Sequence, residues 1–290
     1  MKQLLFLVSL SFFAPNIFAQ QATDTTETDS PKSSLTLGAV YANNASYYGQ
    51  KSAEATPYAA LAATYRFKSG FYLSGLAYKL LNDKTSGISA SSLGAGINFM
   101  LSKRLTADLS YSHSFYSAYS PMLQAGIADN ASASLTYSNW LNVNLSGDAA
   151  FGKQTQDYFV TAGLSKSINL FSISSKDIVT ITPSADIVAG TQRFYKTYVT
   201  KQKERDSVLG IISNPILGGG QNQGNGGSTN NTVTKTSFDI LSYNFKLPLA
   251  YNRASYLVEA AYQYSILSNK VQTQPGKQNS FVTLSFYYQF

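Results

Sequence analysis

The sequence predicts an all-β protein, an antiparallel up-and-down β-barrel of about twelve strands that crosses a membrane. Three observations support this: an N-terminal export segment, apolar residues at every second position in many runs, and connections that are alternately short and long. The composition agrees, because only 13% of the 290 residues are charged and 13% are aromatic. Soluble domains carry about a quarter charged residues.

The first nineteen residues have the pattern of a secretory signal peptide. Lys2 provides a basic start, Leu4 to Ala14 is an apolar core, and Ala19 is a small residue suited to cleavage. Residues 20–33 are polar and are expected to form a flexible periplasmic lead-in to a barrel at 34–290. No later stretch reaches the roughly 18 uninterrupted apolar residues of a spanning helix. The chain also lacks cysteine, which argues against a small disulfide-stapled domain.

The barrel region contains runs in which apolar and polar residues alternate. Each run is about 9 to 11 residues long or slightly longer, the length that a tilted strand needs to cross a membrane. The runs cover 34–41, 58–68, 71–80, 91–101, 105–115, 130–138, 141–151, 157–168, 178–191, 237–251, 255–265 and 280–290.

Each run is expected to turn its apolar face to lipid. In the first six runs, in order, these faces hold Leu35, Leu37 and Tyr41; Leu61, Tyr65 and Phe67; Tyr72, Leu76, Tyr78 and Leu80; Leu93, Ile97 and Phe99; Leu105, Leu109, Tyr111 and Phe115; Leu135 and Tyr137. In the last six they hold Leu141, Val143 and Leu145; Tyr158, Val160 and Leu164; Ile181 and Ile187; Leu241, Tyr243, Phe245, Leu247 and Leu249; Tyr256, Val258 and Tyr262; Val282, Leu284, Phe286, Tyr288 and Phe290.

The opposite faces are small or polar, as Asn142, Asn144, Ser146 and Asp148 show for the seventh run. A soluble sandwich also alternates, but its apolar faces meet in a packed core. Here tyrosine and phenylalanine gather towards the run ends, with alanine, leucine and valine between them. That distribution is typical of aromatic girdles around a lipid-facing band.

The connections favour the same topology. Tight turns are expected at Ser69–Gly70, 102–104, 138–140 and Asn252–Arg253, and longer segments at 42–57, 81–90, 116–129, 152–156, 192–236 and 266–279. In such barrels the short turns are periplasmic and the long loops extracellular. The longest loop, 192–236, begins with basic residues and has a glycine-rich middle at 218–231. It is either a lid, plug or binding loop, or a solvated insertion.

The C-terminal segment, Ser280 to Phe290, resembles the assembly signal of bacterial outer-membrane β-barrel proteins. It alternates Val282, Leu284, Phe286 and Tyr288 and ends on Phe290. The resemblance is to a porin-like fold class and covers residues 34–290. It implies a bacterial outer-membrane location, contact with outer-membrane lipid, and recognition by the barrel-assembly machinery.

Seven charged residues are expected to point into the lumen: Arg66, Lys79, Asp108, Asp148, Asp186, Lys246 and Glu259. A turn at Asn252–Arg253 would place Lys246 nearly opposite Glu259, as a cross-strand ion pair. These charges form either a selectivity ring or structural pairs. Their mixed signs favour structural pairs, since opposite charges cancel one another's field.

The single histidine, His113, is not expected to be catalytic. Outer-membrane phospholipase A is a twelve-stranded barrel with a His-x-Ser arrangement, but Phe115 follows His113 at the serine position, so the resemblance fails at the nucleophile. By alternation, His113 lies on the lipid face near the extracellular rim. Neither a cofactor nor a metal site is predicted.

Three functions remain open on the sequence. The first is a narrow pore or uptake channel for small solutes, with its mouth modulated by the 192–236 loop. The second is a non-conducting structural or surface-interaction barrel, and the third is an outer-membrane lipid-modifying enzyme, which the lack of a catalytic constellation disfavours. Nucleic acid is not an expected partner, because the basic residues do not gather on a helix with aromatic side chains.

Overall fold

The computed structural model describes residues 32–82, 87–117, 120–152, 155–195, 198–200, 202, 237–274 and 276–290. The predicted signal peptide, the lead-in up to residue 31 and the 218–231 segment lie outside this part of the chain. None of the helices within it is long and apolar enough to cross a membrane.

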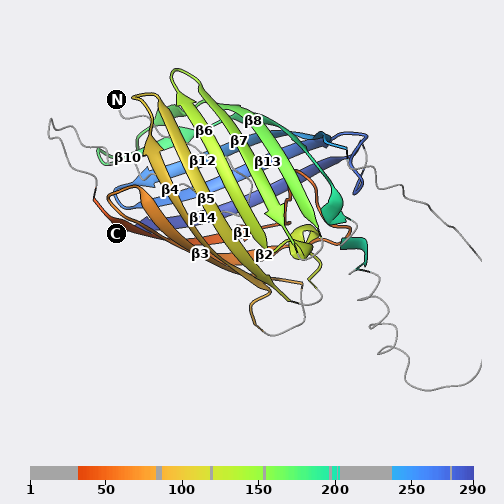
Figure 1. The fold of residues 1–290 in the computed structure, drawn as a ribbon. Helices are drawn as coiled ribbons and strands as arrows, with labels where there is room; N and C mark the ends of the chain where they lie inside the picture. Colours follow the sequence, from red (N-terminus) through yellow and green to blue (C-terminus); the bar gives the residue numbers. More distant parts are fainter. Residues whose placement is uncertain are drawn as a thin grey trace, which may run out of the picture.

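The described residues form one antiparallel sheet that closes on itself (Figure 1). The strands are β1 (Ser34–Ala42), β2 (Tyr58–Arg66), β3 (Phe71–Leu80), β4 (Ala90–Met100), β5 (Leu105–Tyr116), β6 (Asp129–Ser138), β7 (Asn142–Phe151), β8 (Gln156–Ser165), β9 (Ile168–Phe171), β10 (Asp177–Ile181), β11 (Ser184–Gly190), β12 (Asp239–Arg253), β13 (Tyr256–Leu267) and β14 (Gln278–Gln289). The last strand closes against the first, as predicted, with Thr36 opposite Gln289 and Ala42 opposite Thr283.

Twelve of these strands make the closed barrel, which confirms the predicted fold. The short strands β9 and β10 continue the β8–β11 hairpin, because Ser165 pairs with Ser184 and Ile168 with Ile181 in one register. Pro183 interrupts the strand between β10 and β11. Proline cannot donate a hydrogen bond to the ladder, so the regular pairing breaks there.

The two ends of the barrel differ. In Figure 1 the C-terminus lies at the left and the short hairpin turn between β6 and β7 at the upper left, whereas the short helix η1 (Leu123–Gly126) lies towards the right-hand end of the barrel. The predicted alternation of short and long connections therefore corresponds to two opposite mouths. The short-turn end is the periplasmic one in barrels of this type.

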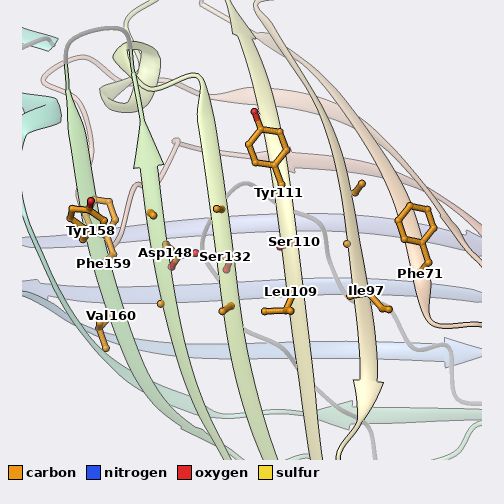
Figure 2. A pocket seen from close by; sticks show the side chains of 16 residues that line it. Phe71, Ile97, Leu109, Ser110, Tyr111, Ser132, Asp148, Tyr158, Phe159 and Val160 are labelled. Atoms are coloured by element: carbon orange, nitrogen blue, oxygen red, sulfur yellow. The ribbon is translucent and has the colours of Figure 1, made fainter.

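Apolar side chains point outward along most strands. Leu61, Leu93, Leu109 and Leu145 are each about half exposed or more, and the polar residues between them face the interior. Figure 2 shows this for β5, where Leu109 and Tyr111 project on one side of the strand and Ser110 on the other. An exposed apolar band around a closed sheet is stable only in lipid, and every backbone group is paired within such a sheet. The chain is therefore a barrel of the bacterial outer membrane.

The lipid-facing side predicted for the third run is wrong. Phe71 and Leu73 point outward, whereas Tyr72, Tyr78 and Leu80 are buried inside the barrel. Large apolar residues occupy both faces of β3, so alternation alone could not choose between them. The turn at Gly70, which has a φ of 88°, pairs Tyr72 with inward Arg66 and so decides the register.

One residue of the tenth run, Leu241, also faces the opposite way from the prediction. Leu241 is fully buried and Ile240 is exposed, contrary to the prediction that Leu241 meets lipid. The pairing between β11 and β12 shifts between Val188 and Ala189, which is a bulge. A bulge adds one residue to one strand, so it reverses the facing of the residues on one side of it.

Candidate functional site

The connection between β1 and β2 folds into the barrel and makes a tight hairpin turn part-way along. Tyr47 and Gln50 exchange two backbone hydrogen bonds, of 2.8 Å and 3.0 Å. Between them Tyr48 and Gly49 have φ values of 51° and 80°. Positive φ at both central residues is the geometry of a two-residue hairpin turn, and it is uncommon for a tyrosine. We call residues 47–50 the lumen hairpin.

The lumen hairpin is held by polar side chains of the inner wall. The hydroxyl of Ser242 on β12 donates to the carbonyl oxygen of Tyr48 at 2.8 Å, and the amide of Asn279 on β14 donates to that of Gly49 at 3.0 Å. A Cβ on Gly49 would lie only 2.4 Å from Oδ1 of Asn244. The hairpin backbone therefore rests directly against the wall, where only glycine fits.

Aromatic rings extend the constriction across the lumen to the far side of the barrel. The Tyr48 ring stacks on Phe159 of β8 with centroids 3.9 Å apart, and Tyr47 packs edge-on against Phe194 at 4.9 Å. β8 lies five strands from β1 in the twelve-strand ring, nearly opposite it. Burial raises the pKa of Tyr47 well above its usual range, with Asp157 and Asp148 as further causes, so this phenol stays neutral.

Two further segments fill the extracellular half of the lumen. The start of the predicted 192–236 loop turns inward, because Asp157 accepts hydrogen bonds from the backbone N–H groups of Arg193 and Phe194, each at 2.7 Å. Segment 120–128 follows β5 and buries Met122 and Leu123 against the barrel interior. The described start of the predicted 192–236 loop thus adds Phe194 and Tyr198 to the interior. Most of this loop lies outside the described residues, and its role as a lid, plug or binding loop or as a solvated insertion stays a prediction.

A polar wall remains beside these segments. The inward residues of β5 to β8 and β11 are almost all hydroxyl, amide or carboxyl side chains, among them Thr106, Asp108, Ser134, Thr136, Asn142, Asn144, Ser146, Asp148, Thr161, Ser165 and Asp186. On the opposite side, where β1 to β3 adjoin β12 to β14, the inner face carries an apolar patch that includes Val40, Ala60, Tyr78, Ala250, Leu257 and Tyr287. The inner surface therefore has a polar wall on one side and an apolar patch on the other.

Glycines on the inner face are partly covered rather than open. A Cβ on Gly96 would lie 2.4 Å from the ring of Tyr72, and one on Gly190 would lie 2.5 Å from the ring of Phe159. These rings lie across neighbouring strands and fill the space that a missing side chain leaves. Gly96 therefore does not widen the lumen.

Three of the predicted lumen charges lie at the polar wall or its edge. Asp108 accepts hydrogen bonds from the Tyr72 hydroxyl at 3.0 Å and from the Asn98 amide at 3.4 Å. The Arg66 guanidinium lies 4.9 Å above the centre of the same Tyr72 ring. Asp148 lies further along the wall on β7, buried between Ser132 and Phe159.

The predicted ion pair between Lys246 and Glu259 does not form. The β12–β13 turn falls at Ala254–Ser255, where Ala254 has a φ of 47°, two residues later than predicted. That shift places Lys246 opposite Gln263, and Glu259 opposite Ala250. Lys246 pairs instead with Asp186 of β11, with 3.6 Å between Nζ and Oδ2.

Lys79 does not lie in the lumen. It pairs with Ala59 on the outward face of β2, while its neighbours Tyr78 and Leu80 point inward. The error follows from the reversed face of the third run, since one reversed strand reverses every side chain on it.

His113 lies on the outward side of β5, beside Asp129 at the extracellular start of β6. Its Nδ1 is 2.6 Å from Oδ1 of Asp129, and the Tyr111 hydroxyl donates to the same carboxylate. Both serines that flank His113 point inward with the even-numbered residues of β5, on the other face of the sheet from the imidazole.

A shallow groove of about 850 Å³ lies below this cluster (Figure 2). Small outward residues of β6 and β7, namely Ala131, Ala133, Gly147 and Ala149, form its floor. It extends across β5 as far as Ile97 and Phe71 on one side, and to Tyr158 and Val160 on the other. It faces the membrane, so its natural filling is lipid hydrocarbon.

Sequence reasoning missed the lumen hairpin, Asp157 and the amides that dock the hairpin. A weak signal was present, because Tyr47-Tyr48-Gly49-Gln50 places two aromatic residues before a glycine within a loop. Glycine after a bulky residue is a turn signal. Nothing in the pattern indicates that the turn enters the barrel.

A scan against protein-family models finds no match, and a search of curated proteins finds none either. Similar solved structures include the KdgM porin, with 10% identity over 89% of this chain and 99% of that chain and a TM-score of 0.47. LpxR from Salmonella typhimurium is 9% identical over 88% of this chain and 99% of its own, with a TM-score of 0.46. The COG4313 outer membrane channel from Pseudomonas putida F1 is 11% identical over 92% of this chain and 100% of its own, with a TM-score of 0.44. The likeness goes no further than the general architecture of a membrane β-barrel.

Proposed function

We propose that this protein is a narrow outer-membrane channel for small polar solutes, constricted at its extracellular half by the lumen hairpin. The observation that carries the proposal is the polar wall on β5 to β8 and β11, which continues past the hairpin. A barrel that served only as a solid support would gain stability from an apolar interior, because buried polar groups add stability only when they are hydrogen-bonded.

The size of the barrel supports the same proposal. Eight strands enclose a space that side chains fill, and 16 to 18 strands enclose an open water channel. Twelve strands leave intermediate room, which the three inward segments reduce on the extracellular side. We therefore expect a small conductance.

Shortening the constricting loop tests the proposal. Ala42 lies directly opposite Tyr58, so a four-residue connection can replace the loop, and deletion of residues 45–55 leaves such a connection. In planar bilayers the wild-type barrel should conduct weakly and the shortened one more strongly. Deletion of residues 218–231 shortens a different connection and serves as the control. An absence of current through both the wild type and the 45–55 deletion would contradict the channel.

A second candidate is a non-conducting barrel whose extracellular surface binds a partner. It is favoured by the apolar packing of Tyr47, Leu123, Phe159, Phe194 and Leu267 inside the extracellular half. On this alternative the inward segments are a permanent filling that fixes the loop conformations. The 45–55 deletion would then lower the thermal stability of the barrel and produce no current.

A further inference from the structure

One charged side chain faces the membrane from the first three strands. β1 to β3 lie wholly within the described part of the chain and hold two charged residues, Arg66 and Lys79. Arg66 is inside, with its guanidinium 4.9 Å from the centre of the Tyr72 ring, whereas Lys79 lies opposite outward Ala59. A lysine that faces lipid is much costlier at the middle of a bilayer than near its surface. Its place along the strand therefore decides what it can contact.

Lys79 is at the outer-leaflet end of its strand. β3 begins after the turn at Gly70, which belongs to the periplasmic end, and Lys79 is the last residue but one, before Leu80. The side chain is therefore near the extracellular membrane surface, where a lysine extends its ammonium group towards lipid head groups. Ammonium groups bind phosphate oxygens through charge-assisted hydrogen bonds. The charge thus suits the phosphate of an outer-leaflet lipid.

An apolar furrow of about 900 Å³ leads to Lys79 across the outer face of the barrel. It follows one register row, in which successive partners are Leu249, Ala260, Leu284, Tyr41, Ala59 and Lys79. Because the strands are tilted (Figure 1), the row climbs from the periplasmic half of β12 to the extracellular end of β3. The row ends at Lys79, since β4 begins only opposite Tyr78. The lysine therefore stands at the upper end of the furrow.

Alanines floor the furrow beside the lysine. Ala59 lies directly across from Lys79 on β2, Ala77 precedes it by two residues on β3, and Ala39 follows on β1. Ile88 of the β3–β4 connection is 67% exposed and lines the furrow as well. The volume lies within the range of about 300–1,000 Å³ that is usual for ligand pockets. An acyl chain laid over these methyl groups would have its head group at Lys79.

The other groove on the outer face lacks the cation. The groove over β6 and β7 (Figure 2) has a similar volume, about 850 Å³, and a floor of small residues such as Ala131 and Ala133. None of the described residues that line it is a lysine or an arginine. It can therefore accept hydrocarbon but offers no positive charge to a head group. Only the furrow at Lys79 combines the two features among these two grooves.

We infer that the furrow at Lys79 binds one anionic lipid of the outer leaflet, with the lipid phosphate at the ammonium group and an acyl chain over Ala59, Ala77 and Ala39. The apolar floor favours a hydrocarbon chain, and the cation favours an anionic head group over a zwitterionic one. The site lies on the outside of the barrel. The inference therefore goes beyond the proposed channel and does not depend on conduction.

Native mass spectrometry of the detergent-solubilised barrel tests the head-group contact. Dipalmitoyl phosphatidylglycerol and dipalmitoyl phosphatidylcholine have the same chains, and only the first has a net negative charge. The ratio of their dissociation constants thus reports head-group preference. The wild type should prefer phosphatidylglycerol, and Lys79→Gln should lower that preference about tenfold, equivalent to about 1.4 kcal/mol. Lys79→Arg keeps the charge and should retain the preference.

Lys103→Gln is the matched control, since Lys103 is an exposed lysine in the β4–β5 turn at the periplasmic end. It should leave the preference unchanged. The heat-modifiable band on a cold gel reports folding, and Lys79→Met replaces the glutamine variant where that variant does not fold. The site would be overturned by a wild type without preference, by a preference that Lys79→Gln retains, or by an equal loss in both glutamine variants. An equal loss would mean general attraction to a basic protein.

Photocrosslinking tests the position of the acyl chain. Phosphatidylglycerol that carries a diazirine in one palmitoyl chain should label peptides of β1 to β3 more than peptides of β6 and β7. Ala59→Leu fills the furrow beside Lys79 and should reduce that labelling, whereas Ala133→Leu fills the other groove and should not. Labelling spread evenly around the barrel, or labelling of β1 to β3 that Ala59→Leu leaves unchanged, would overturn the site.

Discussion

At the scale of single residues, the constriction depends on two neighbours in the chain, Tyr48 and Gly49. Both adopt positive φ, and the tyrosine ring stacks on Phe159 while the glycine backbone meets the wall. A left-handed non-glycine residue costs of order 1–3 kcal/mol and persists only where its surroundings stabilise it. Here the surroundings are the stacked ring and the hydrogen bonds from Ser242 and Asn279.

Gly49→Val should release the lumen hairpin from the wall. A β-branched residue is strained at a φ of 80°, and its Cβ would overlap Oδ1 of Asn244. We expect an intact barrel with a larger single-channel current, measured in planar bilayers. Gly87→Val is the control, because Gly87 also has a positive φ, of 111°, but open space around it. Equal currents in the two variants would show that the hairpin does not limit conduction.

His113→Ala should leave the protein folded and any activity unchanged. The histidine is partly exposed and pairs with Asp129, and an exposed ion pair contributes less than about 1 kcal/mol. The heat-modifiable shift of the folded band on a cold gel reports folding, and a phospholipid hydrolysis assay reports activity. Hydrolysis by the wild type that the variant lacks would instead establish a catalytic role for His113 at the lipid face.

At the scale of elements, the last strand decides whether the barrel closes. β14 pairs with β13 on one side and β1 on the other, and the N–H of Phe290 donates to the carbonyl of Leu35 at 2.8 Å. Without β14 the two edges would leave unpaired backbone groups in hydrocarbon, each costing several kcal/mol. Its outward residues are Val282, Leu284, Phe286, Tyr288 and Phe290. Their role as an assembly signal stays a prediction.

Removal of Ser280 to Phe290 should therefore abolish membrane insertion. The expected product is an aggregated or degraded periplasmic chain, detected by fractionation and protease digestion. Normal amounts of the truncated protein in the outer membrane would contradict the closed barrel.

A point substitution at the end of β14 should distinguish its two faces. Phe290 is 67% exposed to the outside, whereas Gln289 lies opposite Thr36 on the inner face. Phe290→Asp should lower outer-membrane abundance more than Gln289→Asp, because a charge facing lipid is costlier than one facing the lumen. Equal abundance of the two variants would argue against a directional signal.

At the scale of the whole molecule, the barrel is a lipid-facing shell around an interior assembled from its extracellular connections. Three segments from separate parts of the sequence meet in one cluster, with Tyr48 from the first, Leu123 from the second and Phe194 from the third. The polar wall and the apolar patch around Val40 and Tyr287 lie on opposite sides of the interior. Loop insertion, in addition to strand number, thus determines how far the lumen is constricted.

Deletion of residues 218–231 should leave folding intact. The segment is rich in glycine and asparagine and has few apolar side chains to bury, and a doubling of loop length changes the closure free energy by only about 0.6 kcal/mol. The heat-modifiable band on a cold gel is again the measurement. Its loss would mean that this segment stabilises the folded barrel.

The sequence by itself determined the shell. Alternation placed Leu61, Leu93 and Leu145 outward, and the alternation of short and long connections indicated an up-and-down barrel whose last strand meets its first. These features are readable because lipid imposes them locally: each strand needs an apolar face, and every backbone group needs a partner. Where both faces of a strand were apolar, as in β3, this local rule gave no unique answer.

The tertiary structure alone decided the interior. Lys246 meets Asp186 rather than Glu259 because the turn falls at Ala254–Ser255, and Leu241 turns inward because of a bulge. The lumen hairpin reaches Ser242, nearly two hundred residues away in the chain. Inside the barrel each side chain's partner is set by strand register, bulges and loop paths, so residues distant in sequence must be brought together before their chemistry is defined.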